Sequence, residues 1–190
     1  MAEFHYEMKI PGERVAILIG KKGETKRQIE QATKTKLEID SDEGDIIVHG
    51  EDALGMFSTK DIISAIGRGF NPEIALLLLK QDYSFEVISL NDYIKSKSAS
   101  QRVKGRVIGA EGKARRVIEE LTECNLSVYG KTIAILGPIE HVPLARRAIE
   151  SLLAGSPHAN VYHWLEKQRS KMKHATFHSQ SSDSAEPKGI

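Results

Sequence analysis

The alternation of apolar and polar residues divides the first part of the chain into short strands and helices. From Phe4 to Ile10 every second residue is apolar, which predicts a strand with one buried face. Other segments repeat their apolar positions at helical spacing. The predicted elements are, in order, a strand at 4–10, a short apolar helix at 15–19, a helix at 24–34, strands at 36–40 and 45–49, and a helix at 52–68.

The same order of elements returns in the second part of the chain. Ile19-Gly20-Lys21-Lys22-Gly23 recurs 89 residues later as Ile108-Gly109-Ala110-Glu111-Gly112. Around this second motif the pattern predicts a strand at 83–90, a polar segment at 91–106 that Asp92 could cap, a helix at 113–123, strands at 125–129 and 132–136, and a helix at 139–153. The repetition indicates two copies of one unit.

Two further segments complete the predicted organisation. Residues 71–81 begin with Asn71 and Pro72, which favour a helix start, and continue with leucines that are apolar nearly all round, as in a linking helix buried between two domains. A last helix is expected at 158–173. The composition beyond it is typical of disorder. The predicted organisation is domain one at 1–70, the linking helix at 71–81, domain two at 82–173 and a disordered tail at 174–190.

Each glycine loop follows an apolar segment and opens a helix. Glycines allow a backbone to approach a ligand closely, and the first N–H groups of a helix attract anions, phosphate above all. Neither Gly20–Gly23 nor Gly109–Gly112 matches the glycine patterns that bind mononucleotides or dinucleotides. The loops therefore predict contacts to an extended sugar-phosphate chain.

Basic residues gather around both loops although the whole chain carries a net charge of only +1. Residues 13–36 hold 7 basic and 3 acidic residues, and residues 95–116 hold 8 and 1. Local potential, and not the sum, decides what a surface attracts. The candidate contacts to such a chain are Gly20, Lys21, Lys22, Gly23, Lys26 and Arg27 at the first loop, and Lys104, Arg106, Gly109, Ala110, Gly112, Lys113, Arg115 and Arg116 at the second.

Composition narrows the class of protein. Apolar residues make up 40% of the chain and charged residues 28%, which is typical of a globular protein. The longest apolar run, residues 74–79, is far shorter than the ~20 residues of a membrane span, and the mixed, partly acidic start of the sequence leads us to expect no signal peptide. A single cysteine, Cys124, excludes an intrachain disulfide and is expected to be a small buried residue. A reducing, cytoplasmic setting is expected.

The pattern Ile-Gly-x-x-Gly between two helices, followed by a threonine and alternating strands, resembles the KH domain, a module that binds single-stranded RNA. The resemblance implies an α/β fold of the α+β kind, with two type I KH domains, each a three-stranded antiparallel sheet packed by three helices. It also implies that each loop clamps about four nucleotides beside an apolar groove for the bases. The implied groove residues are Ile17, Leu18, Ile29, Leu37 and Ile39 in the first copy, and Val107, Ile118, Leu126 and Val128 in the second.

The chain departs from the KH pattern at three positions. Lys26 and Arg115 stand where many KH domains have an apolar residue, and Glu111 places a carboxylate inside the second loop. A carboxylate there repels phosphate by about 1 kcal/mol at an exposed site. The first loop is thus the more basic one, whereas the second has the more positive surroundings.

The run from Lys104 to Lys113, the leucine-rich linking segment and the run from Ala154 to Tyr162 resemble, more specifically, the archaeal relatives of "partner of Nob one". This resemblance implies binding near the 3′ end of small-subunit ribosomal RNA during ribosome maturation. It also implies a partner such as a PIN-domain endonuclease or another assembly or translation factor. The alternative is a protein-interaction scaffold in which only one KH unit binds RNA.

An enzyme is the competing class of function. A metal-dependent nuclease needs clustered carboxylates, and the dense acidic group Asp40, Asp42, Glu43 and Asp45 lies in one turn and is missing from the second copy. We therefore expect no catalytic residue, no cofactor and no metal site.

Overall fold

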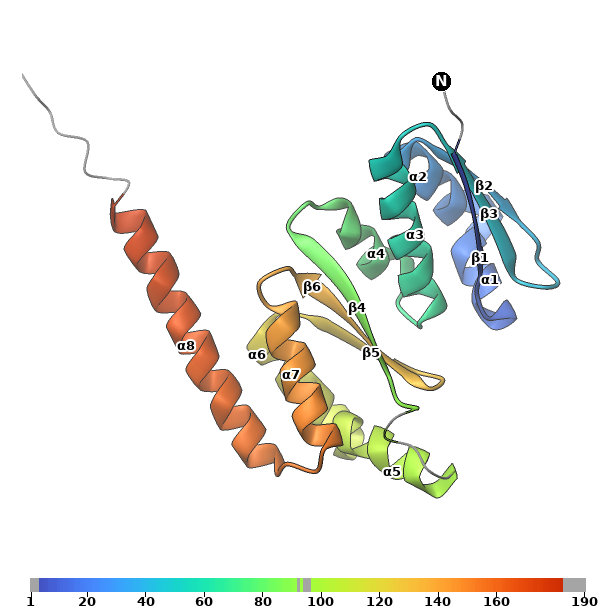
Figure 1. Cartoon of the computed structure of the whole chain (residues 1–190). Helices are drawn as coiled ribbons and strands as arrows, with labels where there is room; N and C mark the ends of the chain where they lie inside the picture. The colour runs from blue at the N-terminus through green and yellow to red at the C-terminus, as the bar shows by residue number, and fades with distance from the viewer. Residues whose placement is uncertain (1–3, 92, 94–96, 183–190) are drawn as a thin grey trace, which may run out of the picture.

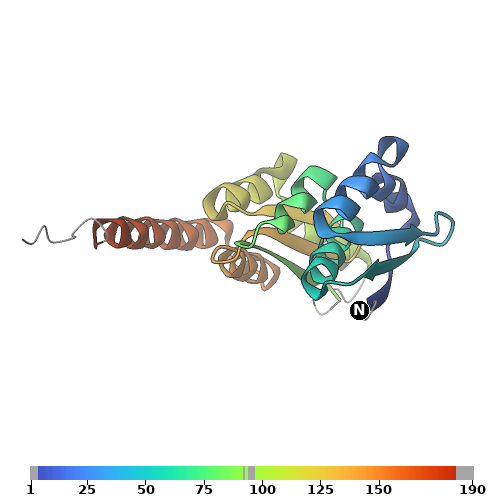
Figure 2. The ribbon, with the colours of Figure 1, turned by 90° about the horizontal axis from the view of Figure 1, so that it is seen from above.

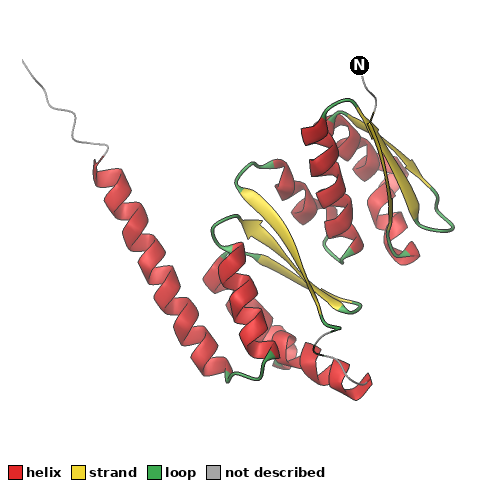
Figure 3. Cartoon of the chain, in the orientation of Figure 1, coloured by secondary structure: helices red, strands yellow, loops and turns green. Residues whose placement is uncertain are grey.

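The structure, a computed structural model, describes residues 4–91, 93 and 97–182. The first unit contains a three-stranded antiparallel sheet of order β1-β3-β2, with Leu37 and Tyr6 on either side of Val48. Three helices cover the side of this sheet that carries the alternating apolar residues (Figures 1 and 3). Its elements are β1 (Phe4–Lys9), α1 (Gly12–Ile19), the 3₁₀ turn η1 (Lys21–Gly23), α2 (Glu24–Thr33), β2 (Thr35–Ile39), β3 (Asp45–Gly50) and α3 (Ala53–Gly67).

The second unit repeats this architecture with a sheet of order β4-β6-β5. Its elements are β4 (Tyr83–Ser89), α5 (Lys97–Ile108), the 3₁₀ turn η3 (Ala110–Gly112), α6 (Lys113–Thr122), β5 (Asn125–Tyr129), β6 (Thr132–Pro138) and α7 (Val142–Leu153). Two such units, each with three helices on one face of an antiparallel sheet, confirm the predicted α+β fold of type I KH domains.

The linking segment is shorter and more irregular than the predicted single helix. It consists of α4 (Pro72–Ala75) and a 3₁₀ turn, η2 (Leu76–Leu79). Ala75 and Leu78 are buried in the core of the first unit, whereas Leu79 at the end of the segment is 40% exposed. The apolar run therefore fills the space between the units, as its composition predicts, over two short elements.

The units pack together through the outer face of the second sheet. Ala134 and Leu136 of β6 are fully buried and belong to the core of the first unit. Phe85 of β4 meets Phe70 edge to face, with ring centroids 6.4 Å apart. Beside them, the Ser127 hydroxyl donates to the Arg68 carbonyl over 2.8 Å. The second sheet is therefore covered on both faces, by its own helices and by the first unit.

The last helix, α8 (His158–Ser182), continues nine residues beyond the predicted end at Lys173. Val161 and Leu165 anchor its first turns in the second core, and Arg147 lies over the Trp164 ring at 4.9 Å. Farther along, α8 leads away from both units (Figure 2). The serines at its end have only slightly lower helix propensity than other residues, so composition alone does not end a helix there. Residues 183–190, the rest of the predicted tail, lie outside the described residues.

Other details differ from the expected elements. Leu54 and Phe57, predicted on the apolar stripe of the helix at 52–68, are 71% and 65% exposed. The helix starts at Ala53, where the Asp52 carboxylate accepts from the Gly55 N–H over 2.9 Å. Leu54 and Phe57 lie on the exposed side of this helix. Asp92, the expected cap of α5, lies outside the described residues.

Candidate nucleic-acid interface

The first glycine of each loop closes a tight turn at the end of a helix. Gly20 and Gly109 have the same backbone angles, φ 73° and ψ 177°. A Cβ added to Gly20 would lie 2.2 Å from Thr25 Oγ1, and one added to Gly109 would lie 2.7 Å from Ala114 Cβ. No side chain fits at either position, because the loop lies directly on the start of the next helix.

The second glycine of each loop is open. Gly23 and Gly112 have φ 75°, and a Cβ at either would meet no atom within 4 Å. Each is followed by a helix, α2 or α6, and no side chain accepts a hydrogen bond from the first N–H groups of that helix. An open, side-chain-free approach to a helix N-terminus suits a phosphate group.

The residue before the second glycine has the left-handed backbone in both loops, with φ 54° at Lys22 and 52° at Glu111. One arginine braces each of these residues. Arg27 donates to the Lys22 carbonyl and Arg116 to the Glu111 carbonyl, both over 3.0 Å. The two arginines therefore hold the shape of the loop and bring a positive charge to it.

The remaining predicted cations divide into exposed ones and paired ones. Lys21, Lys22 and Lys113 are exposed, and Ala110 beside them is exposed too. Lys104 is half-buried on α5. In the described part of the chain no ion pair involves any of these lysines, so their charge is available to a ligand.

Lys26 and Arg115, which replace apolar residues of the KH pattern, each face a glutamate one turn later. Lys26 Nζ lies 4.0 Å from Glu30 Oε1, and Arg115 Nε lies 3.2 Å from Glu119 Oε1. Both glutamates are largely buried, with side chains 21% and 22% exposed. The wall beside each loop is therefore charged on this side.

The structure gives Arg106 partners inside the fold. Its Nε and Nη2 donate to the carbonyls of Leu152 and Ser156 over 2.9 and 2.8 Å, where α7 ends. In the first unit Arg14 binds the carbonyls of Ile66 and Phe70 in the same way. Arg106 therefore caps the end of α7, and its predicted contact to RNA stays a prediction. The sequence did not indicate this capping role, because Arg14 and Arg106 are not at equivalent positions of the repeat.

Most of the implied groove residues lie in the cores. The residues that are at most 2% exposed are Leu18, Ile29, Leu37, Val107, Ile118 and Leu126. Ile17, Ile39 and Val128 are half-buried and can contribute apolar surface beside the loops. Alternation along a strand identifies the buried face, and it does not separate the bottom of a groove from the core beneath it.

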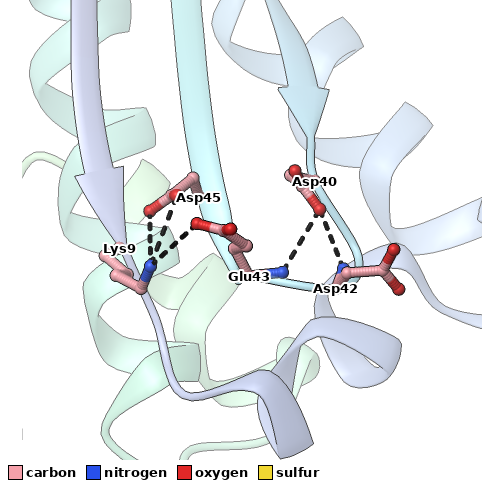
Figure 4. A network of polar contacts seen from close by, with 5 residues as sticks. All are labelled: Lys9, Asp40, Asp42, Glu43 and Asp45. Atoms are coloured by element: carbon pink, nitrogen blue, oxygen red, sulfur yellow. Dashed lines mark hydrogen bonds and ion pairs between the residues drawn. The ribbon is translucent and has the colours of Figure 1, made fainter.

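The acidic hairpin, residues 40–45, has its carboxylates bound by the backbone of the turn and by Lys9 (Figure 4). Asp40 accepts from the backbone N–H groups of Asp42 and Glu43, and these bonds lower its pKa. Lys9 Nζ lies 3.1 Å from Asp45 and 3.8 Å from Glu43. Among the described residues, no group of three histidine, cysteine, aspartate or glutamate side chains could hold a metal ion.

Cys124 is buried, as expected, and its thiol is close to the Thr122 carbonyl at 3.5 Å. Burial raises the pKa of the thiol to about 11, so it stays protonated at neutral pH. Across the described ranges, 4–91, 93 and 97–182, no helix is long and apolar enough to cross a bilayer.

Comparison with known proteins agrees with this geometry. Residues 5–69 match the KH domain model, and residues 84–170 match a model for the eukaryotic-type (type I) KH domain. A KH domain-containing protein, MJ0443, of Methanocaldococcus jannaschii is 51% identical over 174 residues, which are 90% of this chain and 76% of that protein. The chain belongs to the family of proteins with two KH domains.

Other members of this KH family have names that concern ribosomal RNA. The pre-rRNA-processing protein pno1 of Aspergillus fumigatus is 32% identical over 118 residues, and the match spans 46% of its length. Dim2p of Pyrococcus horikoshii, solved in a complex with a/eIF2alpha and rRNA, is 45% identical, with a TM-score of 0.83 over 89% of this chain and 96% of that one. A protein of unknown function from Aeropyrum pernix, APE0754, is 31% identical, with a TM-score of 0.90 over 96% of this chain and all of that one.

Proposed function

We propose that this chain binds single-stranded RNA through its two GxxG loops and the surfaces beside them. The main support is that both loops have the same backbone angles and the same open second glycine in front of an uncapped helix. Exposed lysines lie at each loop, Lys21 and Lys22 at the first and Lys113 at the second. With about four nucleotides per KH loop, two loops on one strand give a footprint of about 8–10 nucleotides.

The RNA we propose is the 3′ end of small-subunit ribosomal RNA, bound during ribosome maturation. Relatives named for pre-rRNA processing and a relative solved with rRNA support this choice. The resemblance to "partner of Nob one" supports a PIN-domain endonuclease as a partner, and the complex of Dim2p with a/eIF2alpha supports a translation factor. Crosslinking in cells should enrich reads at that 3′ end, and reads spread evenly over ribosomal RNA would contradict the assignment.

The test of RNA binding is a pair of double variants, one in each loop, that make the loop more negative. Lys21→Asp with Lys22→Asp changes the first loop, and Ala110→Asp with Gly112→Asp changes the second. Ala110 is exposed, and a Cβ at Gly112 would meet no atom within 4 Å, unlike one at Gly109. The left-handed backbone of Gly112, with φ 75°, strains most side chains, and aspartate is among those that tolerate it best. Fluorescence anisotropy with a labelled 10-nucleotide RNA should show at least tenfold weaker binding for each double variant.

The control is Lys167→Asp with Lys171→Asp, which makes the same charge change as the first-loop variant on two exposed positions of α8. We expect a smaller loss of affinity there. Affinity of the wild type should also fall as salt rises, because phosphate contacts release counterions. Unchanged affinity in both loop variants, with melting curves like the wild type, would refute RNA binding by the loops.

A second candidate is a scaffold in which only the first unit binds RNA. The observation that favours it is Glu111, an exposed carboxylate inside the second loop. In that case the Ala110→Asp, Gly112→Asp variant keeps wild-type affinity for RNA, whereas the first-loop variant loses it. The same pair of variants therefore decides between the two candidates.

The proposed role is not catalytic. The carboxylates that a metal-dependent nuclease would use are engaged with Lys9 and with the backbone of their own turn. Incubation with labelled ribosomal RNA over a magnesium titration should leave the RNA intact, and magnesium-dependent cleavage that the Asp45→Asn variant abolishes would show a nuclease instead.

A further inference from the structure

The first unit carries an exposed apolar surface where the outer strand β1 meets α3. Phe4 and Tyr6, on the helix-facing side of β1, are 50% and 39% exposed, and Leu54 and Phe57 of α3 are more exposed still. Lys60 Nζ lies 5.0 Å from the centre of the Tyr6 ring, so this side of α3 turns toward β1. The four apolar residues, which we call the β1–α3 surface, are four of the seven large apolar side chains exposed among the described residues. Such a gathering marks a surface that another molecule covers.

The second unit shows that the fold does not need this apolar surface. By the register of the strands, Glu86 of β4 takes the place of Tyr6. Arg146 of α7 binds the Glu86 carboxylate over 2.8 Å, at the place where Lys60 of α3 lies over the Tyr6 ring. The same contact between strand and helix is thus a charge pair in one unit and an exposed aromatic ring in the other. The apolar side chains of the first unit therefore serve something other than the fold.

β1 is also an outer strand with an unpaired edge (Figure 1). It is hydrogen-bonded to β3 on one side, and in the described part of the chain no side chain binds its backbone. The outer strands on the other side of each sheet differ from it. Glu30 Oε1 of α2 accepts from the Leu37 N–H of β2 over 2.8 Å, and Glu119 binds the N–H of Leu126 in β5 in the same way. An unpaired edge offers its N–H and C=O groups to a further strand.

We propose that this further strand is β1 of a second molecule of this protein, paired antiparallel about a two-fold axis at Tyr6. Side chains alternate along a strand, so two apolar faces meet only if even-numbered residues lie opposite even-numbered ones. With Tyr6 opposite Tyr6 of the second molecule, Phe4 lies opposite Met8. On the other face His5 lies opposite Glu7, where its ring can donate to the carboxylate. Both faces of the paired strands are therefore complementary.

The side chains along β1 disfavour the neighbouring registers. A shift by two residues in one direction places Glu7 opposite Glu7 and His5 opposite Lys9, which brings groups of like charge together. A shift by two in the other direction pairs only residues 4–6 of the strand, whereas the register at Tyr6 pairs residues 4–8. A shift by one residue turns the apolar face of one molecule against the polar face of the other. The complementary charges of the register at Tyr6 are what favour a second molecule over an unrelated strand.

The same axis brings the α3 helices of the two molecules together. A two-fold axis perpendicular to the joined sheet keeps the helices of both molecules on one side of it. Leu54 and Phe57, on the side of α3 that turns toward β1, then lie beside the axis and are covered by their counterparts. β1 and β2 are opposite edges of the sheet, and the helix after the first loop packs beside β2. The pairing therefore does not use the first loop, and the inference does not depend on RNA binding.

The first experiment measures self-association of the full chain by sedimentation equilibrium, from nanomolar to high micromolar concentration. The wild type should pass from one molecule to two. Tyr6→Glu with Leu54→Glu introduces the residues that the second unit has at these places, Glu86 and Glu140, so the fold accepts them. This double variant should dimerise about tenfold more weakly or less, because a few central residues carry most of the affinity of an interface.

The control is Ile139→Glu with Pro143→Glu, which adds the same two charges at exposed positions of the second unit. It should dimerise like the wild type, and the melting temperatures of both double variants should stay close to that of the wild type. A wild type that is a monomer at high micromolar concentration overturns the inference and leaves the surface to a strand of another protein. A dimer that Tyr6→Glu with Leu54→Glu does not weaken overturns it as well.

A cysteine at the axis tests the register. Cys124 is the one cysteine of the chain, and it is buried, so it does not interfere. Two Tyr6→Cys strands would place their Cα atoms about 4.5–5.5 Å apart, within reach of a disulfide. Phe4→Cys is the control, because its two copies would lie about 13 Å apart along the strands. Mild oxidation should crosslink Tyr6→Cys on a non-reducing gel. A Tyr6→Cys variant that crosslinks no faster than Phe4→Cys overturns the pairing.

Discussion

The two KH units share one backbone and differ in what their surfaces carry. The loops have nearly identical angles, although the first contains Lys21-Lys22 and the second Ala110-Glu111. The shape comes from the glycines and from the bracing arginines Arg27 and Arg116, which both copies have. The residues between the glycines are therefore free to differ, and the charge of a loop can change without a change of fold.

The outer faces of the two sheets show the larger difference. In the second sheet Ala134 and Leu136 are buried against the first unit, whereas the corresponding Ile47 and His49 of the first sheet are half-buried at the surface. The first sheet also carries charged neighbours such as Glu38 on this face. The apolar outer face is the one that the other unit covers. A second apolar outer face, on the first sheet, would be exposed to water and would favour association with further copies.

The cores of the two units also differ, although the backbone fold is the same. In the first unit the hydroxyls of Thr33, Thr35 and Thr59 form a buried chain with distances of 2.7 and 3.0 Å. In the second unit the positions of Thr35 and Thr59 are taken by Cys124 and Ala145. A satisfied chain of hydroxyls and a small apolar pair thus support the same strand-to-helix contact.

The largest expected effect breaks the contact between the units. Ala134→Asn places an amide in a fully buried site without a partner and should lower the free energy of unfolding by about 3 kcal/mol. Ile47→Asn, at the corresponding place in the first sheet, should cost less than about 1 kcal/mol because water reaches it. Urea unfolding measures both. Equal losses would show that the two outer faces are not different environments.

The fold was largely predictable because the repeat made each element visible twice. Two features depend on packing against distant parts of the chain, and the local pattern could not predict them. Leu54 and Phe57 have helical spacing and yet lie on the free side of α3, and the linking leucines form a short helix and a 3₁₀ turn in place of one helix. Spacing shows which residues share a face, but the neighbours that cover that face come from elsewhere in the chain.

The candidate site was predictable where glycine and charge determine it. The loops and their lysines lie as expected at the surface. Arg106 could not be placed, because a basic residue near a loop gives no sign that two carbonyls at the end of α7 will bind it. Glu30 and Glu119 could have been noticed, since they recur 89 residues apart, but their strand partners appear only in the structure.

The second prediction concerns the arginines that cap α3 and α7 from different positions. Arg106→Lys and Arg14→Lys each lose the paired bonds to two carbonyls and should each lower the free energy of unfolding by about 2 kcal/mol. Arg102→Lys, on an exposed position of α5, is the control and should change little. RNA affinity of Arg106→Lys should match that of the control. A stable Arg106→Lys with tenfold weaker RNA binding would restore the role that its position in the sequence indicates.

The third prediction exchanges the charges of the two loops. Lys22 and Glu111 have the same left-handed backbone, so each accepts the other's side chain without new strain. Lys22→Glu should weaken RNA binding about fivefold and Glu111→Lys should strengthen it about fivefold, which corresponds to ~1 kcal/mol for an exposed charge. Both effects should shrink at high salt. Shifts in the same direction would mean that charge at this position does not act on the RNA.

The last prediction tests the interior of the second unit by pH. Burial raises the pKa of the Cys124 thiol from 9.0 to about 11, so the folded state favours the neutral thiol. The stability this adds is fully present below pH 9 and is lost as pH rises toward 11. The difference in unfolding free energy between wild type and Cys124→Ala should therefore be constant from pH 7 to 8.5 and shrink between pH 9 and 11. Since both proteins share every other titrating group, a difference that stays constant to pH 11 would mean that the thiolate is tolerated inside the second unit as well as in water.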